Sequence, residues 1–250
     1  MPLNSSFMNS KYYLSIIIPS YEEEAQLQLT LPKLRNYLIK QDYPWEVIIV
    51  DDGSSDGTPR IPHEIFRKTE SVKVLTRPKN RGKGYSVKQG VIAASGKLIL
   101  VSDADFSTPI EDFEKLHNYI KQGYDIAIGS RSLADSNIEI RQTWYREGMG
   151  RIFNVFVQML VLRGFVDTQC GFKCFDREKL IPIFSQMTVD GFCFDVEFLF
   201  ISKKRGLKTI EVDVNWRNAP HSQVSLVTDP IRMLLDLVRI RQNDKKGIYH

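Results

Sequence analysis

Two carboxylates one residue apart, Asp103 and Asp105, follow directly on the apolar run 97–102. A buried strand that ends in this way places hard oxygen ligands at the carboxyl edge of a sheet, where open α/β sheets bind ligands. Mg²⁺ and Mn²⁺ prefer such ligands and keep positions open for substrate phosphate oxygens. The pattern therefore predicts that Asp103 and Asp105 hold a divalent metal beside a phosphate ester.

A second acidic strand end lies about one strand–helix–strand unit upstream, at Asp51 and Asp52. The small residues at 53–58 allow a tight turn, so these acids can accept hydrogen bonds from imide N–H and ribose hydroxyl groups. A purely structural Asx turn is the alternative. Two strands of one sheet would direct their carboxylates into the same crevice, which favours an enzyme that acts on a metal-bound phosphate ester.

Candidate phosphate contacts come from basic residues near predicted strand and helix ends. Segment 80–84 opens a predicted helix, where glycines let backbone N–H groups approach an anion and where Arg81 and Lys83 add positive charge. Arg131 ends a further strand and could clamp a phosphate with two hydrogen bonds, and Arg146 at the start of a long helix is a second candidate. For each of them a surface position, with the stem packed on the core, is the alternative.

Acids also occur beside aromatic residues. The first strand stops at Pro19 and opens onto Tyr21, which could stack on a base, although an acidic helix N-terminus is an adequate explanation. Asp195 lies among phenylalanines, where a carboxylate is costly unless it is paired or used. An acceptor contact and a buried ion pair are equally open for Asp195. Lys173 either contacts phosphate or lies exposed on a strand.

The elements that must position these residues alternate between short β-branched runs and helical patterns, which predicts an α/β fold with a parallel sheet and crossover helices. Strands are expected at Leu14–Ile18, Trp45–Val50, Val72–Leu75, Leu98–Ser102, Asp125–Gly129, Phe172–Phe175 and Lys208–Trp216. Helices are expected around Leu27–Leu38, with a start or kink at Pro32, around Val87–Ala94 and Phe113–Ile120, and over Trp144–Leu162, Arg177–Gln186, Phe194–Lys204 and Pro230–Ile240. We expect one domain over residues 1–250, with a first half at about 13–135 that carries the metal and phosphate motifs and an acceptor-facing half at about 136–241.

Composition excludes several classes of protein. The net charge of +4 and the lack of a recognition motif argue against nucleic acid as a partner. Three cysteines without paired spacing argue against a zinc site and favour reduced thiols in the cytoplasm. The first ten residues lack the apolar core of a signal peptide, and no run approaches the roughly 18–20 apolar residues of a membrane span.

Peripheral membrane contact is still expected from the second half. The helix 230–240 carries Ile231, Leu234, Leu235 and Val238 on one side, with Arg232, Arg239 and Arg241 around it. Segment 152–162 offers a second apolar surface. Such helices can lie in a lipid interface, held by apolar burial and by attraction to anionic lipid. The alternative is that both helices cover the sheet.

Taken in order, these motifs resemble glycosyltransferase family 2, in particular its polyprenyl-phosphate glycosyltransferases. The resemblance extends from about Tyr13 to Arg241, and Glu22 stands where the family often has Asn. The motifs that carry it are Ile18-Pro19-Ser20-Tyr21-Glu22-Glu23, Val50-Asp51-Asp52-Gly53-Ser54, Asn80-Arg81-Gly82-Lys83-Gly84, Asp103-Ala104-Asp105, Gly129-Ser130-Arg131, Asp167–Phe175, Phe194-Asp195-Val196-Glu197 and Val214-Asn215-Trp216.

The resemblance implies a GT-A fold, which is Rossmann-like with a mostly parallel sheet flanked by helices, and a nucleotide-sugar donor with Mg²⁺ or Mn²⁺. It assigns Pro19, Tyr21, Glu23 and Asp51 to the base or ribose, and Asp103 and Asp105 to the metal. Asp52, Lys83 and Ala104 adjoin them as nucleotide-sugar contacts. It places Arg131 and Arg146 near the phosphates and Asp195 near the acceptor, where each would serve catalysis.

We therefore expect inverting transfer of glucose from UDP-glucose to a polyprenyl phosphate at the membrane surface. GDP-mannose as donor, a non-lipid acceptor and a non-catalytic nucleotide-sugar-binding protein are the alternatives that the sequence leaves open. The retained metal ligands Asp103 and Asp105 argue against the last of these.

Overall fold

The structure is a computed structural model that describes residues 10–67, 69–133, 135–140, 144–217 and 228–250, with the side chains of 139–140 and 144–147 also left undescribed. In the described part a seven-stranded sheet has the order β3-β2-β1-β4-β7-β5-β8. Its strands are β1 (Tyr12–Ser20), β2 (Trp45–Asp51), β3 (Val72–Thr76), β4 (Gly96–Val101), β5 (Ile126–Ser130), β7 (Lys173–Asp176) and β8 (Thr209–Asp213). The pairings are parallel except that β7 runs antiparallel to both β4 and β5. The predicted mostly parallel sheet is confirmed.

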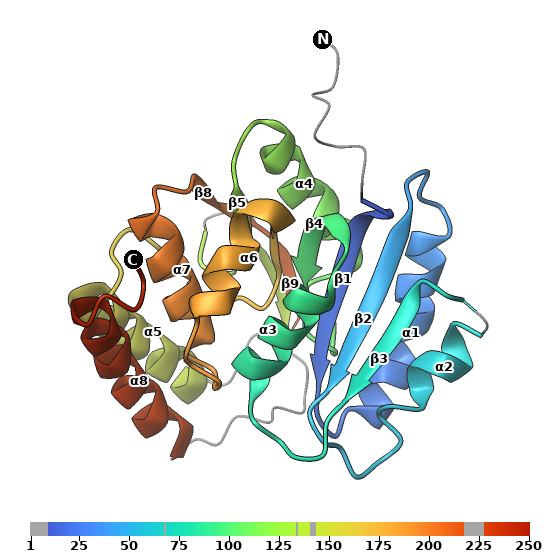
Figure 1. The fold of residues 1–250 in the computed structure, drawn as a ribbon, viewed down its shortest axis with the longest axis horizontal. Coiled ribbons are helices and arrows are strands. Elements are labelled where there is room, and N and C mark those ends of the chain that lie inside the picture. The colour runs from blue at the N-terminus through green and yellow to red at the C-terminus, as the bar shows by residue number, and fades with distance from the viewer. Residues whose placement is uncertain (1–9, 68, 134, 141–143, 218–227) are drawn as a thin grey trace.

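Helices cover both faces of this sheet (Figure 1). The helices are α1 (Glu24–Leu38), α2 (Ile61–Ile65), α3 (Lys83–Ala93), α4 (Phe113–Lys121, after a 3₁₀ turn at Ile110–Asp112), α5 (Trp144–Leu160), α6 (Arg177–Gln186), α7 (Phe194–Lys204) and α8 (Thr228–Lys245). Side chains alternate along each strand, so the sheet separates two apolar cores. Alternate residues of β1 show this: Ile17 packs in the core under α3, α6 and α7, whereas Ile16 and Ile18 pack in the core under α1, α2 and α4.

The chain order creates a crevice at one edge of the sheet. From β1 the chain builds outward through β2 to β3 and then returns to place β4 on the other side of β1. The connections after β1 and β4 therefore diverge, and the space between them at the carboxyl edge is where doubly wound sheets bind ligands. Asp51 ends β2, and Asp103 and Asp105 follow β4 at this edge.

One sequence prediction on the elements is wrong, and one of two alternatives in another is excluded. The strand expected over 208–216 is two strands, because β8 joins the main sheet whereas β9 (Asn215–Arg217) pairs with β6 (Asn137–Ile140) in a separate two-stranded sheet. The helix that was expected to start or bend near Pro32 already begins at Glu24, so a start at Pro32 is excluded.

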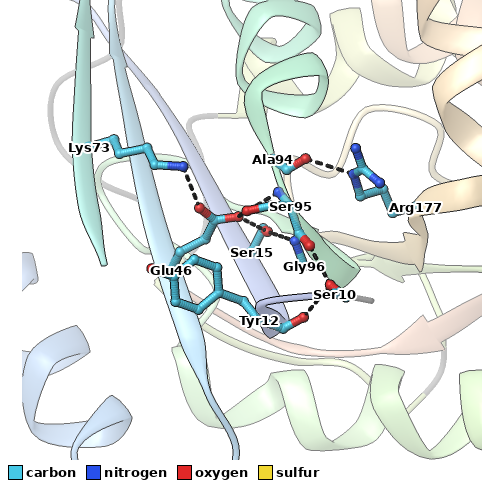
Figure 2. Close-up of polar contacts among 9 residues, drawn as sticks. All are labelled: Ser10, Tyr12, Ser15, Glu46, Lys73, Ala94, Ser95, Gly96 and Arg177. Carbon is cyan, nitrogen blue, oxygen red and sulfur yellow. Dashed lines mark hydrogen bonds and ion pairs between the residues drawn. The ribbon is translucent and has the colours of Figure 1, made fainter. Parts of the chain in front are cut away.

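The opposite edge of the sheet is held by a buried polar network around Glu46 (Figure 2). The carboxylate accepts hydrogen bonds from the hydroxyl of Ser15 at 2.6 Å and the backbone N–H of Ser95 at 2.6 Å, and Lys73 Nζ lies 2.9 Å from its second oxygen. Ser15 in turn accepts the Gly96 N–H at 2.8 Å. The network joins the starts of β1, β2 and β4, far from their carboxyl ends, and so serves the frame rather than the crevice.

Candidate active site

A cavity of about 720 Å³ opens at the carboxyl edge of the sheet. Most of the residues singled out from the sequence contribute to its wall, namely Pro19, Tyr21, Glu23, Asp52, Lys83, Asp103, Ala104, Asp105 and Arg131. Asp51 and Asp195 are buried beside the cavity without lining it. Arg146 lies in α5, and its side chain is outside the described part of the chain.

The connection after β1 is held by hydrogen bonds to the connection after β2. Backbone N–H groups of Glu22, Glu23 and Glu24 donate to Ser54, Thr58 and Asp56 at 2.9, 2.8 and 3.2 Å. The last of these contacts supplies an acceptor to the first N–H group of α1, which a helix start leaves without an internal partner. The tight turn expected at 53–58 therefore shapes the wall that presents Tyr21 and Glu23.

Backbone strain in the described residues occurs beside the cavity. The non-glycine residues with positive φ are Glu22, at 53°, and Phe106, at 45°. Each adjoins cavity-lining residues, Tyr21 and Glu23 in one case and Asp105 in the other. Such backbone conformations are costly and persist where the surroundings enforce them, commonly at functional sites. A left-handed residue at 22 also explains why Asn suits this position in related motifs, because Asn tolerates that conformation better than Glu.

Asp51 and Asp52 have different surroundings. Asp51 Oδ1 accepts the Ser54 N–H at 3.1 Å, which closes the turn, whereas its buried Oδ2 has no hydrogen-bond partner within the described structure. Asp52 accepts the N–H groups of Arg81 and Gly82, the latter at 2.7 Å. Asp52 thus holds the loop that carries Lys83, and Asp51 keeps an acceptor for a further donor.

Asp103 and Asp105 form an acidic pair beside Lys83. Lys83 Nζ lies 2.5 Å from Asp103 Oδ1, and Asp105 Oδ1 accepts the Ser107 N–H at 2.8 Å. Burial and the neighbouring Asp103 raise the pKa of Asp105. Burial also acts to raise the pKa of Asp103, but the Lys83 ammonium outweighs it and holds that pKa below its ordinary value.

Two further features suit Asp103 and Asp105 to binding a cation. Burial, and next the charges of Asp105 and Asp103, raise the pKa of Glu23 to about 7, so the cavity wall concentrates negative charge. Gly171 leaves room for the Asp103 carboxylate, since a Cβ at residue 171 would lie 2.2 Å from Asp103 Oδ2. Within the described residues no group of three or more His, Cys, Asp or Glu side chains forms a closed metal site. The two carboxylates therefore suit a metal that completes its coordination with donor oxygens.

Part of the Arg131 guanidinium is hydrogen-bonded to a carboxylate, so not all of its N–H groups are available to a phosphate. Asp167 accepts from Arg131 Nε at 2.7 Å, from Nη2 at 2.8 Å and from its backbone N–H at 3.0 Å. The Arg131 guanidinium outweighs the effect of burial and lowers the pKa of Asp167 to about 2. Glu211 on β8 fixes Asp167 by accepting its backbone N–H at 2.7 Å. A phosphate would therefore meet the Nη1 side of Arg131.

Asp195 lies in a buried ion pair, one of the two alternatives left open by the sequence. Lys173 Nζ is 2.7 Å from Asp195 Oδ1 and also donates to the Cys170 carbonyl. The prediction of an exposed strand lysine at 173 is wrong, because β7 lies between β4 and β5 and Lys173 is 2% exposed. Burial raises the pKa of Asp195 despite the nearby Lys173.

The second half of the chain contributes cavity residues that the sequence pattern did not indicate. Arg81 reaches across to Asp190 at 2.7 Å, which joins the Lys83 loop to segment 187–193. Trp216 of β9 lines the cavity, and so does a set from α8: Asp229, Arg232, Met233, Leu235, Asp236 and Arg239. The amphipathic pattern predicted the helix itself, but no local signal places it at the cavity.

Comparison with known proteins extends these observations. A family model described as "Glycosyl transferase family 2" matches residues 15–184. A dolichyl-phosphate beta-glucosyltransferase of Dictyostelium discoideum is 37% identical over 249 residues, covering 95% of this chain and 76% of that protein. The protein of the same name from Saccharomyces cerevisiae is 34% identical, with 99% of this chain and 79% of the relative covered.

Solved structures share the fold at lower identity. Mannosyl-3-phosphoglycerate synthase from Rubrobacter xylanophilus is 19% identical with a TM-score of 0.69, covering 94% of this chain and 75% of that one. Glucosyl-3-phosphoglycerate synthase from Mycobacterium tuberculosis, solved with Mn²⁺, UDP and glucosyl-3-phosphoglycerate, is 17% identical with a TM-score of 0.66, covering 93% and 80%. These neighbours confirm the predicted GT-A arrangement of sheet and helices.

Proposed function

The chain belongs to glycosyltransferase family 2, and on this premise we propose that it transfers glucose from UDP-glucose to a dolichyl-type polyprenyl phosphate. The observation that carries the proposal is the cavity wall where Asp103 and Asp105 lie beside the Lys83 loop. The two carboxylates can hold a metal ion, and the lysine can neutralise the negative charge of a nucleotide diphosphate. Curated relatives that match nearly the whole chain are named for this glucosyl transfer, which supports the choice of sugar and acceptor.

The donor nucleotide would lie along the ends of β1 and β2. Tyr21 and Pro19 line this part of the cavity and can pack on a base, while the unpartnered Oδ2 of Asp51 can accept an imide N–H. Uracil carries one such imide donor. The Ser54 N–H donates to Asp51 Oδ1 at 3.1 Å and so helps to fix the direction of this carboxylate.

The diphosphate would lie between Lys83 and Arg131, with Asp103 and Asp105 holding Mg²⁺ or Mn²⁺. When bound, the metal would stabilise the negative charge that develops on the leaving diphosphate. Lys83 and the Nη1 side of Arg131 add positive charge from the protein itself. Ala104 keeps the two acidic residues apart at the strand end, and Arg146 is a further candidate phosphate contact.

The acceptor needs no strong general base in this proposal. A lipid phosphate is already anionic, so its oxygen can attack the anomeric carbon directly while the bond to the UDP oxygen breaks. A single in-line displacement inverts the configuration and gives a β-linked product from an α-linked donor. Asp195, which is buried behind Lys173, is then a positioning residue that keeps this lysine beside Asp103.

The acceptor side would face an anionic lipid surface. Two helices that pack together, α5 and α8, expose apolar side chains at helical spacing: Ile152, Val155 and Met159 on one, and Ile231, Leu235 and Val238 on the other. Arg232 and Arg239 flank the second set at the cavity mouth. Leu234, which was expected on this surface, packs partly against the core. Within the described residues no helix combines the length and hydropathy that crossing a bilayer requires.

Vesicle co-sedimentation tests this membrane contact. We expect binding to anionic vesicles that weakens with salt and in a double variant with R239E and R241E. Leu235→Ser should also weaken it, whereas Leu29→Ser should not, although Leu29 is equally exposed, at 66% against 65%. Equal binding of both serine variants would contradict the assigned surface.

The reaction itself is tested with a panel of UDP- and GDP-sugars, each with and without polyprenyl phosphate. The proposal predicts metal-dependent transfer of glucose from UDP-glucose to the lipid. Preferred transfer from GDP-mannose would mean that the proposed donor is wrong. Transfer to a soluble acceptor alone would mean that the proposed lipid acceptor is wrong. Nucleotide-sugar binding without any turnover would contradict an enzymatic function.

A further inference from the structure

A buried carboxylate outside the donor site joins two walls of the cavity, segment 187–193 and α8. Glu197 on α7 is fully buried, and within the described residues it forms no ion pair. Its oxygens accept from Thr188 N–H at 2.9 Å, Thr188 hydroxyl at 2.8 Å and Val189 N–H at 2.9 Å. The Tyr249 hydroxyl donates a further bond at 2.5 Å. Because a buried charge is costly without such donors, the network holds all its members together.

Asn243 on α8 completes this network. Its amide donates to the Thr188 hydroxyl oxygen at 2.8 Å and to the Tyr249 hydroxyl oxygen at 3.2 Å. A side-chain amide has two N–H groups, and both are used here. Each hydroxyl therefore accepts from Asn243 and directs its own hydrogen to Glu197, which leaves one consistent arrangement of donors.

The joined elements are those that form the acceptor side of the cavity. Segment 187–193 contains Thr188 and also Asp190, Gly191 and Phe192, which line the cavity. Helix α8 lines it over 229–239 and carries Asn243 one turn further along. Apolar packing of Met233, Leu237 and Ile240 also holds α8, but such packing is not directional. The hydrogen bonds of Asn243 have preferred angles, so they can constrain the rotation of this helix.

We propose that Glu197 is a positioning residue which, through Tyr249 and Asn243, fixes the rotation of α8 and so shapes the acceptor side of the cavity. The donor side depends on the ends of β1, β2 and β4 and shares no hydrogen bond of this network, but Asp190 of segment 187–193 pairs with Arg81 of the Lys83 loop. Loss of the network should therefore affect the acceptor more strongly than the donor. This inference rests on the proposed function for its kinetic measurement only.

The test compares two tyrosine variants. Tyr249→Phe keeps the ring that packs edge-on against Phe200 and removes only the hydroxyl. Tyr37→Phe is the matched control, because Tyr37 also donates to a glutamate, Glu114, at 2.6 Å, but between α1 and α4. We expect Tyr249→Phe to raise the KM for polyprenyl phosphate about threefold to tenfold, the effect of one such hydrogen bond, with a smaller change in the dissociation constant of UDP-glucose. Tyr37→Phe should change neither quantity.

Hydrogen–deuterium exchange gives a readout that needs no acceptor. The amides of 231–240 and 188–192 should exchange faster in Tyr249→Phe than in the wild type or in Tyr37→Phe. Unchanged exchange there, or an acceptor KM that rises no more than the dissociation constant of UDP-glucose, would overturn the positioning role. If the wild-type protein does not use polyprenyl phosphate, the proposed function fails while the exchange measurement still decides the role of Glu197.

Discussion

The ammonium nitrogen of Lys83 lies 2.5 Å from Oδ1 of Asp103, so a proposed phosphate contact is paired with a proposed metal ligand. The pair joins the start of α3 to the connection that follows β4. In the protein without ligands the positive charge of Lys83 balances the negative charge of the Asp103 carboxylate. A donor diphosphate would offer Lys83 an alternative partner, which couples donor binding to metal binding.

Lys83→Met should therefore strengthen the binding of Mn²⁺ to the nucleotide-free protein. A unit charge a few ångströms away is worth several kcal/mol at an effective dielectric constant near 20, so we expect at least about a tenfold gain. Calorimetric titration with Mn²⁺ measures it, and Lys79→Met, an exposed lysine of the same loop, is the control. An unchanged or weaker affinity in Lys83→Met would show that the pair does not oppose the metal.

Asp105→Asn should abolish transfer while the protein stays folded. The change removes one anionic oxygen ligand and leaves the charge of the leaving diphosphate poorly compensated, so kcat should fall by about two orders of magnitude or more. Transfer assays at increasing Mg²⁺ measure the loss, with circular dichroism as the check on folding. Near-wild-type turnover at saturating metal would refute the assignment of Asp105.

Gly171→Ala should weaken metal binding without touching any ligand. The added Cβ would lie 2.2–2.6 Å from the carboxylate atoms of Asp103, which must then move. We expect Mn²⁺ affinity to fall by about tenfold, in line with the effect of residues that orient metal ligands. Gly150→Ala is the control, because a Cβ added at residue 150 would meet no atom within 4 Å. Equal affinities in the two variants would mean that Asp103 does not bind the metal from its present place.

Glu46→Gln should destabilise the protein at neutral pH and less so in acid. Burial acts to raise the pKa of Glu46, but hydrogen bonds from Ser15, Lys73 and Ser95 outweigh it and hold the pKa below its ordinary value of 4.5. A lowered pKa in the folded state means that the carboxylate stabilises the fold above pH 4.5 and that this contribution is lost as the pH falls through the folded-state pKa.

Urea unfolding of wild type and Glu46→Gln across pH 3 to 7 measures this dependence, with a difference at pH 7 of about 1–3 kcal/mol, typical of a hydrogen-bonded buried charge. Glu64→Gln, at an exposed glutamate that pairs with Arg60, should show little effect at any pH. A difference for Glu46→Gln that grows toward acid would reverse the sign assigned to this pKa.

The sequence predicted that the residues proposed for the donor lie together, because they follow buried strands. A run such as 97–102 followed by Asp103 and Asp105 indicates both the strand and the edge at which it ends. Parallel strands then bring Asp51 and Asp103 to one crevice without any further information.

The acceptor side could not be predicted in the same way, since its contacts are long-range. The burial of Lys173 depends on β7 entering the sheet between β4 and β5, which no local pattern reveals. The strand expected over 208–216 divides at Val214 because its two parts have different partners, β5 and β6. The amphipathic pattern of α8 predicts a helix with one apolar side but not the cavity that this helix borders.

The proposed reaction is the transfer of glucose with inversion from UDP-glucose to a polyprenyl phosphate. The most direct measurement uses UDP-glucose labelled at its anomeric carbon, polyprenyl phosphate and Mg²⁺, followed by NMR of the lipid extract. We predict a labelled β-glucosyl phosphate in the lipid fraction, absent when the metal is chelated or when Asp105 is replaced by Asn. A label that stays in free glucose, or an α-linked lipid product, would contradict the account.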